Sequence, residues 1–146
     1  MNEWLHIQRD FPASVEELFQ FFVNPEKLVR WHHPDDCEPL EAKLEPVIGG
    51  LFYVDMRPLQ QPAEVVSVRG RVLAVDWNRS LRFSWKWISG PLKEAPESVV
   101  ELEFLPTPKG AVLRISQGSF SNEDMKAIHA SGWKMALDGL LLDLQP

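Results

Sequence analysis

The chain has almost none of the features that mark a secreted, disulfide-bonded or membrane protein. Its one cysteine among 146 residues, Cys37, excludes a disulfide within the chain, which suits a reducing compartment. Apolar runs last only a few residues, whereas a membrane-spanning helix needs about 20. Residues 1–6 show no basic region followed by an apolar stretch, so we expect no secretory signal. The sequence predicts a cytoplasmic protein that does not enter a membrane.

Positive charge is also scarce. The 15 Lys and Arg residues are scattered among 21 Asp and Glu residues, and the formal net charge is −6. A nucleic-acid surface needs a basic stripe that neutralises phosphates, and the sequence contains no such stripe. We therefore expect no nucleic-acid partner.

The common catalytic motifs are missing as well. The sequence has no Gly-x-Ser-x-Gly elbow, no phosphate-binding glycine loop and no His-Glu-x-x-His. Cys37 lies beside Asp35, Asp36 and Glu38, and negative charge disfavours the reactive thiolate. We expect a non-enzymatic protein with no catalytic residue and no cofactor.

What the sequence does contain is an ordered succession of helix and strand patterns. Residues 4–10 alternate as a strand does. Ser14 and Asn24 can each cap a short helix, and Pro25 suits the first position of the second helix. No repeat or linker divides the chain, so we predict one domain over residues 1–146.

Strand patterns dominate the middle of the chain, and one long helix ends it. The strands are predicted at residues 38–45, 51–57, 65–75, 80–89, 98–105 and 111–119. Short connections rich in Pro and Gly indicate an antiparallel meander. An amphipathic helix is predicted from Asn122 to about Leu144, about 33 Å long and so able to lie along the whole sheet. A twisted sheet around one helix need not fill the enclosed space.

Large apolar side chains gather on one face of this predicted sheet. Residues 81, 83, 85 and 87 are large and apolar and alternate with polar ones, so they share a face. They either line a pocket, with indole N–H groups and a histidine as polar anchors, or fill the space themselves. The candidate ligand-binding residues are Trp31 at the cavity mouth, Phe52, Met56, Phe83, Trp85, Trp87, Phe104, Met125, His129 and Trp133.

Two histidine-containing segments could carry chemistry. His129 could act as an acid or base, but no carboxylate at a fixed spacing partners it, so we favour a structural hydrogen bond beside Trp133. Residues 32–37, His-His-Pro-Asp-Asp-Cys, contain every common type of metal ligand. They lack the paired spacings of zinc sites. We interpret this segment as a solvated loop that could cover the cavity, and we expect no metal.

Several segments are similar to a known family. They are residues 11–19 (FPASVEELF) with Pro25 and Trp31, 49–52 (GGLF), 70–75 (GRVLAV), 81–85 (LRFSW) and 129–133 (HASGW) followed by Leu137. Through them the chain resembles the helix-grip superfamily, also called START-like, birch-pollen-allergen-like or SRPBCC. Within it the chain resembles the group named after the activator of heat-shock-protein-90 ATPase. The resemblance implies an α+β fold in which a seven-stranded curved antiparallel sheet grips the C-terminal helix. Two short helices between strands 1 and 2 close one end.

Three functions follow as hypotheses. The first is a non-enzymatic domain that holds a small hydrophobic or aromatic molecule between sheet and C-terminal helix. The second, implied by the resemblance, is a co-chaperone-like module whose partner is a chaperone. The eukaryotic co-chaperones also use a second domain, for which this sequence shows no counterpart. The third is a cyclase- or hydratase-like enzyme that uses the same pocket. An exposed edge strand would permit a homodimer, so monomer and homodimer both remain open.

Overall fold

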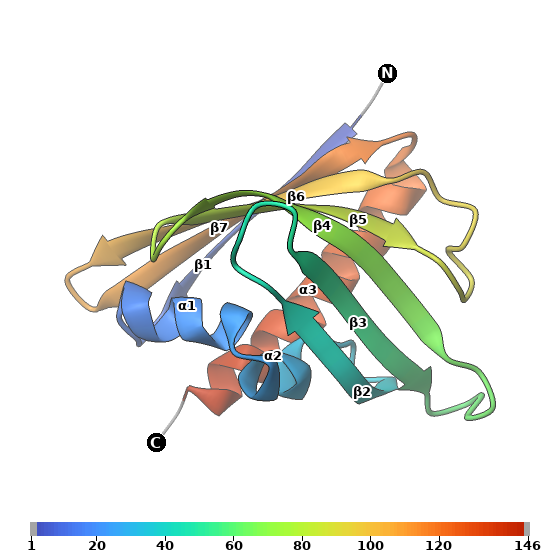
Figure 1. Cartoon of the computed structure of the whole chain (residues 1–146). Coiled ribbons are helices and arrows are strands. Elements are labelled where there is room, and N and C mark those ends of the chain that lie inside the picture. The colour runs from blue at the N-terminus through green and yellow to red at the C-terminus, as the bar shows by residue number, and fades with distance from the viewer. Residues whose placement is uncertain (1–2, 145–146) are drawn as a thin grey trace.

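A computed structural model of the chain describes residues 3–144, so the first two and last two residues of the predicted domain lie outside the described part. The elements are β1 (Glu3–Phe11), α1 (Val15–Val23), α2 (Pro25–Trp31), β2 (Cys37–Leu44), β3 (Leu51–Pro58), β4 (Val66–Asp76), β5 (Ser80–Trp87), β6 (Ser98–Thr107), β7 (Gly110–Phe120) and α3 (Glu123–Asp143). The predicted α+β fold is confirmed, with each element within a few residues of its expected place (Figure 1).

The seven strands form one antiparallel sheet in the order β1-β7-β6-β5-β4-β3-β2. All strands from β2 to β7 pair with their neighbours in sequence, as short hairpin connections require. β1 pairs with β7 and is thus one edge of the sheet, while β2 is the other. The meander predicted from the sequence is therefore confirmed. Only β1 pairs with a strand that is distant in the sequence, namely β7.

Capping side chains fix where the helices begin. The Ser14 hydroxyl accepts a hydrogen bond from the Glu17 N–H at 3.1 Å, and the Asn24 carboxamide oxygen accepts one from the Glu26 N–H at 3.0 Å. Asn122 does the same for the N–H of Met125 at 2.9 Å. Each cap satisfies a backbone donor that the first helical turn leaves without a partner.

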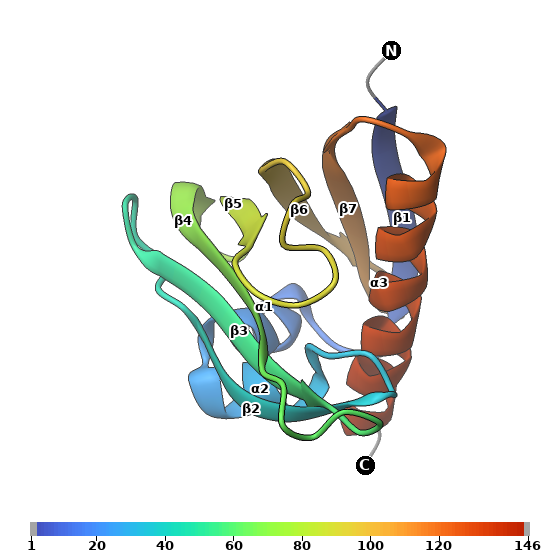
Figure 2. The same ribbon diagram turned by 90° about the vertical axis from the view of Figure 1, so that its right-hand side faces the viewer.

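The helices cover the concave face of the sheet unequally. α1 buries Phe19 and Phe22 against Phe104 of β6, each with a ring-centroid distance of 5.3 Å. α3 packs against β1, β7 and α2, and Figure 2 shows it standing beside β1 and β7, across the fold from β2 and β3. Helices thus close one end and one side of the concave face, and space can remain between α3 and strands β3–β5.

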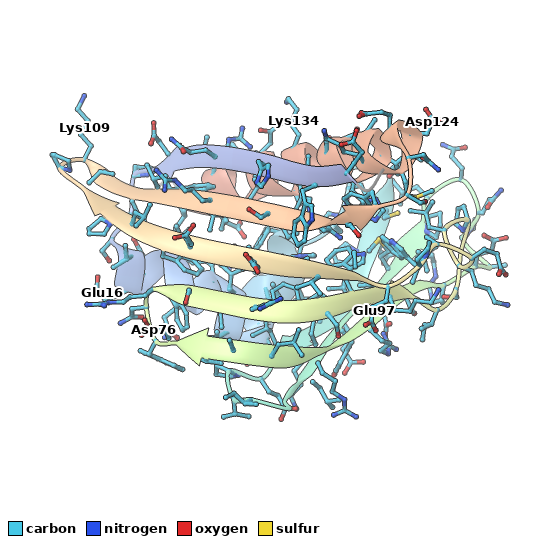
Figure 3. The ribbon with its side chains drawn as sticks, turned by 90° about the horizontal axis from the view of Figure 1, so that it is seen from above. Glu16, Asp76, Glu97, Lys109, Asp124 and Lys134 are labelled. Atoms are coloured by element: carbon cyan, nitrogen blue, oxygen red, sulfur yellow. The ribbon has the colours of Figure 1, made fainter. Side chains whose placement is uncertain are left out.

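The convex face of the sheet is exposed to solvent. Arg82 and Glu101 face each other across β5 and β6 with an N–O distance of 3.3 Å, and Arg114 donates a hydrogen bond to Gln8 at 3.2 Å. Figure 3 shows this face, with Asp76 and Lys109 at one end and Asp124 at the other. No helix within residues 3–144 is long and apolar enough to cross a membrane.

Candidate ligand-binding cavity

A cavity of about 540 Å³ lies between the C-terminal helix and the sheet. One wall comes from Met56, Val66, Trp85 and Trp87 of β3, β4 and β5. The opposite wall is α3 between residues 128 and 136. The segments 32–37, 61–64 and 91–92 contribute residues to the rim. The volume falls within the range of about 300–1,000 Å³ that is usual for small-molecule sites.

Three tryptophans shape the cavity. Trp85 and Trp87 are two residues apart on β5, so both point to the concave face, and their rings lie 5.6 Å apart, edge to face. Trp133 reaches toward Trp85 from α3, with a centroid distance of 5.8 Å. All three line the cavity, which gives it large, mainly apolar and aromatic surfaces.

His129 is fixed between a strand and its own helix. Its Nε2 accepts a hydrogen bond from the Trp87 indole N–H at 3.0 Å, so its Nδ1 carries the proton and donates to the Met125 carbonyl at 2.8 Å. Burial lowers the pKa of His129, against the opposing effect of the bond to Met125. Both ring nitrogens are engaged, so the geometry favours a neutral, structural histidine over a proton-transfer group.

A buried amide holds Trp133 in place. Gln117 of β7 is fully buried, and its Oε1 accepts a hydrogen bond from the Trp133 indole N–H at 2.7 Å. Its amide nitrogen in turn donates to the Ser98 hydroxyl at 3.0 Å. These two hydrogen bonds link Trp133, Gln117 and Ser98, and they fix the orientation of one cavity wall.

His32 is the functional candidate that the sequence analysis missed. It follows α2 directly and is only 6% exposed, with its ring 5.1 Å from that of Trp133 and 5.8 Å from that of Trp85. Burial, with a smaller contribution from His33, lowers its pKa to about 4. The interpretation of residues 32–37 as a wholly solvated loop is therefore wrong for His32. A signal was present: residues 28, 31 and 32 share one helical face.

The rest of this segment borders the cavity as well. His33, Pro34, Asp36 and Cys37 all line it. Burial, followed by the charge of Asp36, raises the pKa of the Cys37 thiol to about 11, so the thiol stays protonated and unreactive. Within residues 3–144, no three His, Cys, Asp or Glu side chains are grouped so that they could hold a metal ion.

The structure separates the ten predicted site residues into two groups. Met56, Trp85, Trp87, His129 and Trp133 line the cavity, and Met125 lines a small pocket that adjoins it. The other four, Trp31, Phe52, Phe83 and Phe104, are almost completely buried in the packed core.

The expected position of Trp31 at the cavity mouth is wrong. Its ring packs on Phe22 at 4.7 Å, and its indole N–H donates to the Phe21 carbonyl at 2.8 Å. α1 and α2 therefore enclose this side chain, and its neighbour His32 takes the place at the cavity.

A curved antiparallel sheet, a long C-terminal helix and an apolar cavity between them define a helix-grip domain. The model of the family described as "Activator of Hsp90 ATPase homolog 1-like protein" matches residues 12–141. The chain belongs to this family.

Solved structures show the same fold. The AHSA1 protein of Silicibacter pomeroyi is 24% identical with a TM-score of 0.82, over 97% of this chain and 96% of that one. A protein of Chromobacterium violaceum is 18% identical with a TM-score of 0.83, over 99% of each chain. A protein of Mesorhizobium loti is 23% identical with a TM-score of 0.77, again over 99% of each chain. A comparison with curated proteins gave no match.

Proposed function

We propose that this protein binds a small hydrophobic molecule in the cavity between α3 and strands β3–β5, without transforming it. The observation that carries the proposal is the cavity of about 540 Å³ in the concave face. Burying an apolar molecule there removes its surface from water, at about 25 cal/mol per Å². The walls supplied by Trp85, Trp87 and Trp133 suit a flat aromatic molecule.

Three titratable side chains that line the cavity support binding without catalysis. His32 and His129 both have lowered pKa values, and the pKa of Cys37 is raised to about 11. All three side chains are therefore uncharged near neutral pH. The His129 lone pair is also occupied by Trp87, whereas a general base needs a free lone pair directed at its substrate.

Gly132 allows a clean test, because it lines the cavity and a Cβ placed on it meets no atom within 4 Å. In Gly132→Leu, we expect the new side chain to occupy the cavity and abolish binding of the neutral fluorescent probe 1-aminoanthracene. Replacing a helical glycine also stabilises the helix by up to about 1 kcal/mol, so lost binding will not reflect unfolding.

Gly139→Ala is the matched control. Gly139 lies on the same helix, away from the cavity-lining residues, and its added Cβ would meet only the Trp31 carbonyl oxygen at 3.9 Å. This variant should gain helix stability and keep probe binding. Equal probe affinity in Gly132→Leu and the unchanged protein would refute a ligand site in this cavity.

A second candidate function is a surface interaction with a chaperone, and one exposed apolar patch favours it. Ile48 is 77% and Val47 59% exposed in the loop between β2 and β3. This loop is held against β4 by a hydrogen bond from the Gly49 N–H to the Val72 carbonyl, near the exposed Leu51 and Leu73. Ile48→Ser should weaken capture of a heat-shock-protein-90 chaperone if this function holds, while Gly132→Leu should leave that capture unchanged.

A further inference from the structure

One buried indole in the cavity wall differs from the others in its hydrogen bonding. The indole N–H groups of Trp31, Trp87 and Trp133 each donate to a protein acceptor, at 2.8, 3.0 and 2.7 Å respectively. Trp85 is only 6% exposed, yet its Nε1 has no partner. A buried donor without a partner is destabilising, so Trp85 differs from the other three indoles in a way that calls for an explanation.

The neighbouring His32 has the complementary unpaired atom. The effect of its own backbone raises the pKa of His32 against the larger effect of burial, and Nδ1 is the ring nitrogen nearer to that backbone. The neutral ring therefore presents the Nε2 lone pair as an acceptor, and this buried atom has no partner either. The His32 and Trp85 rings are adjacent, with centroids 5.8 Å apart, and both line the cavity.

A donor and an acceptor side by side select a group that can both accept and donate. A hydroxyl oxygen can accept from the Trp85 N–H while its proton goes to His32 Nε2. A carbonyl or an ether oxygen would satisfy only Trp85. Both nitrogen atoms are shielded from solvent, so a small rotation of one ring must expose them to the bound molecule.

The charges around the cavity exclude an anionic group at this position. The lining contains Asp36 and Glu64 but neither Lys nor Arg. A buried carboxylate or phosphate would lose its hydration without gaining a counter-ion, which is strongly unfavourable. The polar group that reaches Trp85 and His32 must therefore be neutral.

We propose that the ligand is a neutral hydroxylated aromatic molecule, whose hydroxyl group bridges Trp85 Nε1 and His32 Nε2. This inference rests on the proposed function, because it describes what the same cavity selects. The wall residues Trp87 and Trp133 would contact the aromatic body, and the hydroxyl would supply the two hydrogen bonds that the wall lacks.

The test compares 2-naphthol with 2-methoxynaphthalene, which keeps the ring system and oxygen but cannot donate a hydrogen bond. Because 2-methoxynaphthalene can still accept from Trp85 but leaves His32 Nε2 without a donor, we expect 2-naphthol to bind at least about tenfold more tightly. In His32→Phe this preference should fall to about twofold or less, whereas Trp85→Phe should weaken the binding of both probes. Gly139→Ala, on α3 outside the cavity lining, should retain the preference.

Indole NMR signals give an independent readout. The Trp85 N–H signal, assigned by its loss in Trp85→Phe, should move downfield with 2-naphthol and less with its methyl ether. Equal affinities for the two probes, with cavity binding intact, would overturn the hydroxyl proposal but leave the proposed function standing. So would a Trp85 signal that 2-naphthol leaves unchanged, because His32 or a bridging water would then already satisfy it. If neither probe binds, or if Gly132→Leu binds both as well as the unchanged protein, the proposed function itself fails.

Discussion

Replacing His32 by phenylalanine should remove a large part of the protein's sensitivity to acid. Burial lowers the pKa of His32 from 6.5 to about 4. Between these pH values the His32 ring is therefore protonated in the unfolded chain but neutral in the folded protein. Stability therefore falls as the pH drops from about 6.5 to about 4. A difference of 2.5 pKa units, at about 1.36 kcal/mol each, corresponds to about 3 kcal/mol.

The measurement is urea denaturation followed by circular dichroism at pH 4, 5, 6 and 7. We expect His32→Phe to gain about 3 kcal/mol relative to the unchanged protein between pH 7 and pH 4. Carboxylates such as Asp138, whose pKa is lowered mainly by its bond to Arg9, lose their stabilising effect in both proteins and cancel in the comparison. His129 also titrates in both, with its pKa lowered by burial.

His6→Gln is the matched control, because His6 is exposed and bonds only to the Ser116 hydroxyl at 3.0 Å. Its stability profile should run parallel to that of the unchanged protein. An NMR titration of the His32 ring provides a second measurement that needs no variant. A ring signal that titrates near pH 6.5, or parallel profiles for His32→Phe and the unchanged protein, would refute the buried neutral His32 described above.

Two further substitutions test the buried packing of β7 and α3. Gln117→Leu should destabilise the protein by about 1–3 kcal/mol in urea denaturation, because it leaves the Trp133 N–H without an acceptor, and the Trp133 indole NMR signal should broaden or shift. Leu137→Ala should cost about 2–5 kcal/mol in the same assay, since Leu137 is fully buried on α3. Leu142→Ala, at an exposed position of the same helix, should change stability by under about 0.5 kcal/mol.

The fold was predictable because each local signal agreed with the final structure. The two-residue alternation around Trp85 placed the right side chains on the concave face of β5, and the caps at Ser14 and Asn24 placed both short helices. Periodicity reports which face a side chain points to, but it does not report what lies opposite that face.

That limit explains why only part of the predicted site lines the cavity. Phe83 and Phe104 share the concave face with Trp85, but α1 fills the space opposite Phe104 with Phe19 and Phe22. Where α1 and α2 end, nothing equally large replaces them, and the cavity begins. The position of this boundary depends on how the helices pack against the sheet, which no short stretch of sequence encodes.

His32 shows that local sequence can also fail to predict a residue that does line the cavity. Its surroundings in sequence, a second histidine, a proline and two aspartates, are typical of an exposed loop. However, α2 ends with the His32 N–H bonded to the Leu28 carbonyl at 3.1 Å, so His32 continues the helical face that buries Leu28 and Trp31. The turn thus directs one imidazole inward, while His33 bonds to the carbonyls of Arg30 and Pro34.

Family membership and the cavity answer different questions about this protein. The matching family model extends over residues 12–141 and accounts for the fold, but one fold can serve several functions. The ligand hypothesis depends on an inner surface that includes Gly132, and the chaperone hypothesis on an outer one that includes Ile48. Because α3 and the β2–β3 loop lie in different parts of the fold, substitutions at these two positions should act independently. If the protein must bind its ligand before it can engage a chaperone, Gly132→Leu would instead lose both ligand binding and chaperone capture. Measuring both activities in both variants therefore distinguishes two separate functions from one coupled function.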